Sequence, residues 1–113
     1  MRPPVERYIE RMRSERHLSP RTLEQYRFDL EKLDELAGEI PFQLLDSNHI
    51  RRFISKLHGS GLSPRTLAKC LSVWRGFFKY AVAHEEAYVQ NPVKSIKPPR
   101  FQKNLPDALS PDE

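Results

Sequence analysis

Apolar side chains recur at helical spacing in four segments of the chain. Within residues 3–17, 19–38, 46–58 and 63–86 they fall at intervals of three, four and seven, as on a helix with one buried face. The last segment has the widest apolar stripe, so we expect it to form the central helix of the core. The pattern predicts a compact, all-α domain of four helices. The predicted stripes are Val5, Tyr8, Ile9 and Met12; Leu23, Tyr26, Leu30, Leu33 and Ala37; Ile50, Phe53, Ile54 and Leu57; and Leu67, Cys70, Leu71, Trp74, Phe77, Phe78, Ala81 and Val82.

A six-residue motif marks the start of two of these segments. Leu-Ser-Pro-Arg-Thr-Leu stands at residues 18–23 and again, unaltered, at residues 62–67. The Ser suits an N-cap, the Pro suits the first helical position, and the two Leu residues are spaced for a hydrophobic staple. Residues 45–50 repeat the frame with Asp46 as the cap. In both full copies an Arg stands beside free backbone N–H groups and the positive end of the helix dipole, which favours an anion there.

The repeat has a second possible meaning, a solenoid of two-helix units, because such units have a similar period. However, the residues that follow the two copies bear no likeness to one another, and the helix starts are unevenly spaced. We therefore interpret the repeat as shared helix-start chemistry.

Charge is distributed unevenly along the chain, whose formal net charge is +4 at pH 7. Residues 1–39 carry eight Lys or Arg and nine Asp or Glu, whereas residues 40–106 carry eleven and three. A basic half on a small domain favours nucleic acid over an acidic protein or an anionic lipid surface. A basic surface that is merely solvated would have the same composition, so charge alone leaves both interpretations open.

Several classes of function lack their usual signals. No apolar run approaches the roughly 20 residues that a membrane span needs, and no segment resembles a signal peptide, so we expect a cytoplasmic protein without membrane contact. The single cysteine, Cys70, excludes an internal disulfide and fits a buried structural thiol. His17, His49, His58 and His84 lack metal-ligand spacing, and no Gly-rich phosphate loop or nucleophile motif is present. We expect no catalytic residue, no metal and no cofactor.

The face of the 63–86 helix opposite its apolar stripe is basic, small or polar, and free of acids. With the two helix starts it could bind double-stranded DNA: Thr and backbone N–H groups would hold phosphates, and Gln25, Arg75 or Lys79 could reach base edges. Gly76 lies on this face, where Gly costs about 1 kcal/mol relative to Ala. It therefore indicates either the close approach of another backbone or tight packing against the first helix. The candidate DNA contacts are Arg21, Thr22, Gln25, Arg65, Thr66, Lys69, Ser72, Arg75, Lys79, Lys97 and Arg100.

A helical protein-interaction module is the main competing hypothesis, and it would need an exposed apolar patch. Phe28 and Phe42 are the candidates for such a patch. Phe28 falls on the outer face of the second helix, where we expect a neighbouring segment to cover it. A one-domain DNA-binding regulator is the third hypothesis.

Asn91-Pro92 ends the helical part, and we place one domain at residues 1–93. Residues 94–113 form the predicted linker, which as far as residue 106 holds cations and prolines without an acid, the composition of a stiff extended segment. Ser-Pro-Asp-Glu at residues 110–113 is a capping box that would open another helix. We therefore expect a further domain to follow, which counts against the one-domain regulator.

These residues together resemble the core-binding, SAM-like domain of tyrosine site-specific recombinases. The likeness rests on both copies of the six-residue motif, on Tyr26 with Asp29-Leu30, and on residues 71–78 (LSVWRGFF). Asn91-Pro92, Lys97-Pro98-Pro99-Arg100 and Leu105-Pro106 are similar to the stretch that leads into the family's catalytic domain. The likeness covers nearly the whole chain in the right order. It is strongest to the recombinases that resolve chromosome dimers, with phage-type integrases as the alternative.

The resemblance implies a four-helix half of a C-shaped clamp around DNA, with the basic linker crossing to a catalytic half outside this chain. The parent enzyme would cut one DNA strand through a tyrosine nucleophile, hold a 3′-phosphotyrosine link and rejoin the strand, together with a second recombinase protomer. It implies a role in DNA recombination or integration and in chromosome segregation at cell division. One position departs from the family: residue 28 is often basic in relatives and is Phe here, so we expect the second helix to bring less charge to DNA than is usual in the family.

Overall fold

The computed structural model describes residues 2–97, which form four α-helices and one short 3₁₀ turn. The elements are α1 (Pro3–Glu15), α2 (Pro20–Ala37), η1 (Phe42–Leu44), α3 (Ser47–Gly59) and α4 (Pro64–His84). The described residues contain no strand, so the predicted all-α fold is confirmed. Each α-helix begins and ends within a few residues of its predicted bounds, whereas η1 was not predicted.

The two copies of the six-residue motif start α2 and α4 as predicted. The hydroxyl oxygens of Ser19 and Ser63 accept hydrogen bonds from the backbone N–H groups of Thr22 and Thr66, each at 3.2 Å. In both helices Pro occupies the first turn, where a backbone N–H would have no partner. Local sequence is therefore enough to set both helix starts.

The start of α3 is capped by a reciprocal pair. The Asp46 carboxylate accepts from the backbone N–H of His49 at 3.0 Å, and His49 Nδ1 accepts from the backbone N–H of Asp46 at 3.1 Å. The imidazole thus takes the place that Glu or Gln holds in the usual capping box. The predicted cap is confirmed, and its second member is a histidine.

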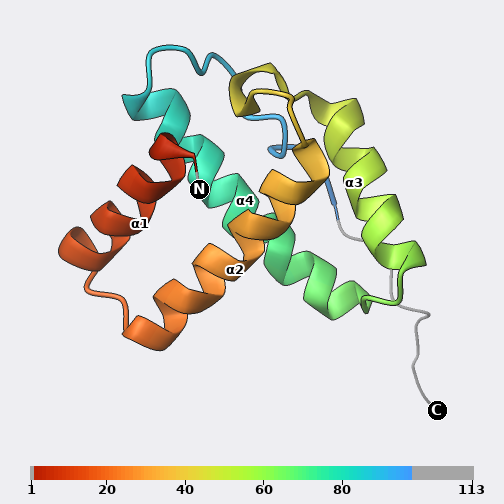
Figure 1. The fold of residues 1–113 in the computed structure, drawn as a ribbon, viewed down its shortest axis with the longest axis horizontal. Coiled ribbons are helices and arrows are strands. Elements are labelled where there is room, and N and C mark those ends of the chain that lie inside the picture. The colour runs from red at the N-terminus through yellow and green to blue at the C-terminus, as the bar shows by residue number, and fades with distance from the viewer. Residues whose placement is uncertain (1, 98–113) are drawn as a thin grey trace.

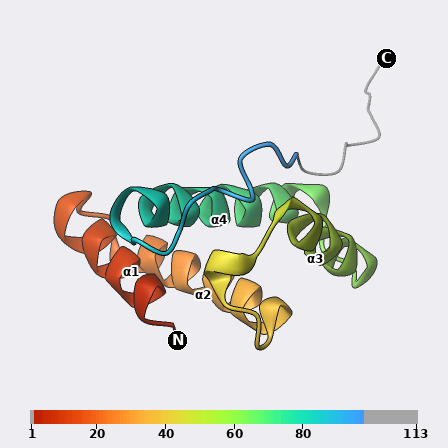
Figure 2. The same cartoon turned by 90° about the horizontal axis from the view of Figure 1, so that it is seen from above.

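Helices α2 and α4 cross at the centre of the domain, with α1 and α3 on either side of the crossing (Figure 1). Helix α4 packs against each of the other three, and Figure 2 shows α1 and α2 together on one side of it. Trp74, Phe77 and Phe78 on α4 have no exposed surface. The prediction that α4 is the central helix is confirmed.

Two apolar residues lie where the sequence pattern did not place them. Phe42 was a candidate for an exposed patch, but η1 turns it into the core, where it is 2% exposed and contacts Phe77 edge to face. Val82 was assigned to the buried stripe, but it is 40% exposed beside Val89 in a shallow hollow. Val82 lies in the last turns of α4, on a side of the helix that the described residues leave uncovered.

Gly76 lies where α1 approaches α4. A Cβ atom at this position would come within 2.9 Å of the Tyr8 hydroxyl oxygen, closer than real contacts allow. Of the two reasons considered for this glycine, tight packing against the first helix is the one confirmed.

After α4 the chain returns along the same helix (Figure 2). The Arg75 guanidinium donates to the backbone oxygens of Val93 at 3.4 Å and Ile96 at 2.7 Å, and the Asn91 side chain donates to the backbone oxygen of Arg75 at 3.2 Å. Ile96 is 5% exposed, so the first residues of the predicted linker lie folded on α4. The domain boundary after residue 93 stays a prediction, and residues 98–113 lie outside the described part.

Candidate nucleic-acid interface

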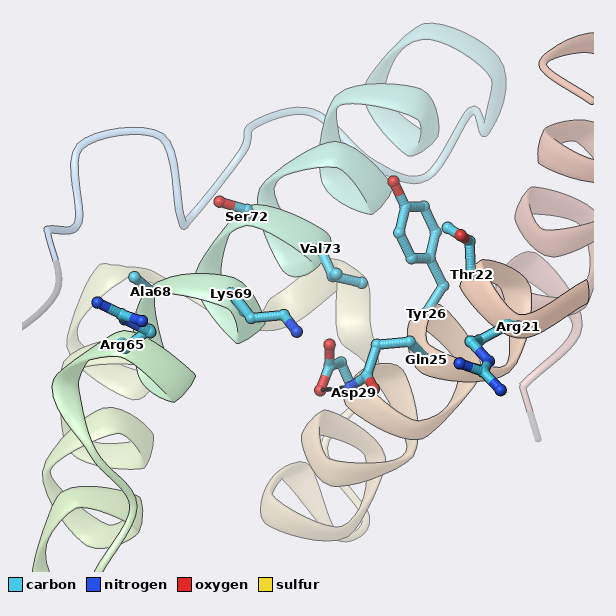
Figure 3. Close-up of a pocket in the computed structure, with 10 residues that line it drawn as sticks. All are labelled: Arg21, Thr22, Gln25, Tyr26, Asp29, Arg65, Ala68, Lys69, Ser72 and Val73. Atoms are coloured by element: carbon cyan, nitrogen blue, oxygen red, sulfur yellow. Dashed lines mark hydrogen bonds between the residues drawn. The ribbon is translucent and has the colours of Figure 1, made fainter. Parts of the chain in front are cut away.

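The N-terminal halves of α2 and α4 enclose a groove of about 640 Å³, which we call the α2–α4 groove (Figure 3). Both helices begin at the same edge of the domain (Figure 1), and residues of both motif copies, Arg21, Thr22 and Arg65, line the groove. The groove is lined by Arg21, Thr22, Gln25, Tyr26, Asp29, Arg65, Ala68, Lys69, Ser72 and Val73.

The tertiary structure brings most of the predicted DNA contacts into this one groove. Arg21, Thr22 and Gln25 come from α2, and Arg65, Lys69 and Ser72 come from α4 (Figure 3). All of them except half-buried Thr22 are exposed. Residues that lie far apart in the sequence thus form one cationic and polar surface. Their contact with DNA stays a prediction.

Four of the other predicted contacts lie in the described chain but outside the groove. Thr66 is exposed at the start of α4, where its hydroxyl accepts from that of Ser63 at 3.1 Å. Lys79 is exposed and lines a second hollow of about 780 Å³ beside Val82 and Lys94. Lys97 is exposed at the end of the described chain, and Arg100 lies beyond it.

Arg75 also lines the second hollow, yet its side chain is half-buried and bonded to backbone oxygens of residues 93 and 96. These bonds use Nε and one Nη2 hydrogen, so the side chain is held against its own domain while its Nη1 donors take no part in them. Its contact with base edges stays a prediction.

The starts of α2 and α4 have fewer free backbone N–H groups than the motif alone indicates. Thr22 N–H and Thr66 N–H are taken by the Ser caps, and the Leu at the next position donates to the backbone oxygen of the same Ser. Pro has no N–H. Among the described residues, the first-turn N–H that keeps no partner is that of Arg21 in α2 and of Arg65 in α4. An anion at either end would therefore be held mainly by an Arg side chain and one backbone N–H.

Asp29 forms part of the groove floor and was not predicted to have a role in the site. It is 1% exposed, and its Oδ1 atom accepts from Gln25 Nε2 at 3.2 Å and from Cys70 Sγ at 3.4 Å. The Lys32 ammonium lies 3.7 Å from the same oxygen. The sequence did contain a signal that Asp29 is buried, because Asp29 falls one turn after Tyr26 and one turn before Leu33 on the buried stripe.

The thiol of Cys70 is buried beneath this floor. Burial and the neighbouring Asp29 carboxylate raise the pKa of Cys70 to about 12. Because the thiolate is the reactive form, burial and the raised pKa both disfavour a nucleophilic role for this cysteine. The prediction that Cys70 is a buried structural thiol is confirmed.

Phe28 differs from its prediction. It is 54% exposed, and its partner is the Lys32 ammonium, which lies 3.7 Å from the ring centroid. The expected cover by a neighbouring segment is wrong, because α1 packs on the other side of α2 and leaves this face open. The ring instead lies beside a shallow hollow that Glu24 and Glu31 also line.

Other chemistry has little support within residues 2–97. These residues contain no group of three or more His, Cys, Asp and Glu side chains that could hold a metal ion. No described helix is both long and apolar enough to cross a lipid bilayer.

Comparison with known proteins gives consistent matches. Residues 5–85 match the phage integrase N-terminal SAM-like domain. Tyrosine recombinase XerC from Ralstonia pickettii is 41% identical over 98% of this chain and 35% of its own length. The XerC proteins of Pseudomonas savastanoi and Shewanella amazonensis are 38% and 35% identical, each over 96% of this chain and 37% and 36% of their own lengths. The chain thus spans about a third of the length of these curated relatives. No solved structure matches it.

Proposed function

The chain belongs to the family of phage integrase N-terminal SAM-like domains, and we propose that it binds double-stranded DNA as the N-terminal half of a tyrosine recombinase. The observation that carries this proposal is the α2–α4 groove. It presents Arg21, Arg65 and Lys69 together with the neutral donors of Gln25 and Ser72, while its acid, Asp29, is buried. Exposed cations supply affinity through counterion release, and the polar groups between them suit phosphates and base edges.

The parent protein is proposed from its relatives. Proteins named tyrosine recombinase XerC match nearly the whole chain. We infer that the parent breaks and rejoins DNA through a 3′-phosphotyrosine intermediate, and that it resolves chromosome dimers beside a second recombinase protomer. In this proposal the present domain binds one side of the duplex, and a catalytic domain beyond residue 113 completes a C-shaped clamp.

Cations outside the groove extend the proposed surface. Lys79 lies further along α4, and Lys97 stands where the chain leaves the described domain. We propose Lys79, Lys97 and Arg100 as further DNA contacts, and Arg100 lies outside the described residues. Thr66 would contribute a hydroxyl at the start of α4.

The test is fluorescence anisotropy of the chain on a duplex of about 30 base pairs, or roughly three helical turns, that carries a dimer-resolution site. We expect affinity to fall steeply with salt, and Arg65→Ala or Lys69→Ala to reduce the slope of log K against log[salt] by about one unit. Arg13→Ala is the matched control, because Arg13 is an exposed Arg of α1 outside the groove lining. Unchanged binding by both groove variants would exclude the groove from the interface, and no binding at low salt would reject the function.

A protein partner is the second candidate, because Val82 and Val89, which are 40% and 81% exposed, both line the second hollow. An apolar patch of this kind would support self-association that is independent of salt. Sedimentation velocity of the wild-type chain and of Val89→Ser distinguishes the two: a salt-independent dimer that Val89→Ser abolishes would favour the interaction module.

A further inference from the structure

A buried carboxylate at the floor of a DNA-facing groove requires an explanation. Asp29 is 1% exposed, and removing a carboxylate from water is costly unless neighbouring groups compensate for it. Its Oδ1 atom has three polar neighbours, whereas its Oδ2 atom has no hydrogen-bond partner among the described residues. An apolar residue would fill the site more cheaply if packing were the only requirement.

The chemistry of the carboxylate fixes the orientation of Gln25. Asp29 Oδ1 accepts from Cys70 Sγ and faces the Lys32 ammonium, so it acts as an acceptor, and of the two ends of the Gln25 amide only the NH₂ group can donate to it. Asp29 follows Gln25 by one helical turn on the same face of α2, and Gln25 Nε2 lies 3.2 Å from Asp29 Oδ1. This bond uses one Nε2 hydrogen and leaves the second hydrogen and the Oε1 acceptor for another partner. Gln25 is exposed on the groove wall (Figure 3), so these two groups are accessible there.

We propose that Asp29 is a positioning residue that orients the Gln25 amide to recognise adenine in the major groove. An adenine presents an N6 amino donor beside an N7 acceptor, and a glutamine amide pairs with them through its oxygen and one N–H. A freely rotating amide could exchange its two ends and lose this match. The proposal rests on DNA binding by the α2–α4 groove, and it adds a base preference and the residue that sets it.

The remaining contacts of Asp29 separate this role from a structural one. Its backbone oxygen accepts from Trp74 Nε1 at 2.8 Å, and a side-chain substitution leaves that bond in place. Asn has nearly the shape of Asp but carries an NH₂ group that can donate to Gln25 Oε1, so Asp29→Asn allows the amide to turn over. Lys32→Ala is the matched control, because it removes another polar neighbour of the same oxygen without touching the amide.

The experiment measures the affinity of the wild-type chain, Gln25→Ala, Asp29→Asn and Lys32→Ala for duplexes in which each A·T pair of the site is replaced in turn by G·C. We expect the wild-type chain and Lys32→Ala to prefer adenine at one position by roughly 5- to 150-fold, the range of a good bidentate pair. Gln25→Ala and Asp29→Asn should each lose the adenine preference, while the slope of log K against log[salt] stays unchanged. Loss of the preference by Gln25→Ala but not by Asp29→Asn would overturn the role of Asp29.

A second arm leaves Asp29 unchanged, so it holds even if Asp29→Asn does not fold. 7-Deazaadenine at the preferred position lacks the N7 acceptor. It should weaken binding by the wild-type chain and have no effect on Gln25→Ala. An equal effect on both proteins, or no effect on the wild-type chain, would overturn the proposed contact. Salt-dependent binding that shows no preference at any A·T position would overturn the base preference while leaving DNA binding intact, whereas the absence of salt-dependent binding would overturn both proposals.

Discussion

The two copies of Leu-Ser-Pro-Arg-Thr-Leu, at residues 18–23 and 62–67, form the same helix start in different surroundings. Ser19 and Ser63 have nearly the same backbone angles, with φ of −65° and −73° and ψ of 155° and 156°. Their bonds to the Thr N–H groups have the same length, 3.2 Å. The last Leu of each copy differs: Leu67 has no exposed surface, whereas Leu23 is only partly buried.

The residues after each copy explain the difference in surface charge between the two helices. On its outer side α2 carries Glu24 and Glu31 around the exposed Phe28 ring. The polar side of α4 carries Lys69 and Lys79 and no acid. The comparison teaches that six residues determine how a helix begins, whereas packing and the following residues determine what the helix contributes.

Leu67→Ala should destabilise the domain far more than Leu23→Ala. Removing a fully buried Leu side chain leaves a cavity that costs about 2–5 kcal/mol, and a partly buried Leu loses only part of this. Urea unfolding followed by circular dichroism gives both free energies of unfolding. Equal losses would show that the two copies contribute equally to the core.

Arg65→Ala should weaken DNA binding more than Arg21→Ala. Each Arg stands at the second position of its helix, but Arg21 shares a hollow with Glu24 and Glu31, whose charges oppose an incoming phosphate. We expect the salt slope to fall by about one unit for Arg65→Ala and by less for Arg21→Ala. Anisotropy titrations at several salt concentrations measure both slopes. A larger fall for Arg21→Ala would make α2 the main phosphate-binding helix.

Ser19→Ala and Ser63→Ala should destabilise the domain by the same amount, about 1 kcal/mol each. The reason is that the cap bonds are equal in length and both Ser residues are exposed. Thermal and urea unfolding of the two variants give the comparison, with Ser14→Ala inside α1 as a control that removes no cap. A clear difference between them would show that packing around the caps determines their strength.

The third helix start should add a dependence on acid that the Ser caps lack. The backbone N–H of His49 holds the pKa of Asp46 below its ordinary value. The cap therefore contributes fully above about pH 4, and its contribution is lost as pH falls through the lower pKa of the folded state. Asp46→Ser should flatten the fall in unfolding free energy between about pH 4 and pH 2. Glu6 and Glu85 also have lowered pKa values, but they titrate in both proteins and cancel in the difference. Identical pH profiles would contradict the role of the Asp46 charge.

Side-chain periodicity and cap chemistry predicted the fold well, because both act within one or two helical turns. The four helices, the central position of α4 and the buried Cys70 all follow from spacing along the chain. The prediction was wrong for Phe42, Val82 and Phe28, and in each case the exposed fraction depended on another segment. η1 turned Phe42 inward, whereas no described segment covered the sides of Val82 or Phe28.

The candidate site was predicted as a set of residues but not as a surface. Arg21, Gln25, Arg65 and Lys69 were chosen from separate helices, and only the crossing of α2 and α4 places them in one groove. The position of Asp29 on the buried stripe was visible in the sequence. The role of Asp29 was not visible in the sequence. The carboxylate contacts both Gln25 on its own helix and Cys70 on α4, and the second contact depends on how the two helices pack.

The sequence by itself determined where each helix begins, which face of it is apolar and which family the domain resembles. These properties depend on capping, proline placement and side-chain order, which act over a few residues. The tertiary structure alone decided that the two Arg-bearing helix starts share a groove, that the Arg75 side chain is held by residues 93 and 96, and that the Asp29 carboxylate is buried against Cys70 of α4. These features arise from packing between segments distant in the chain, and local spacing carries no information about such distances.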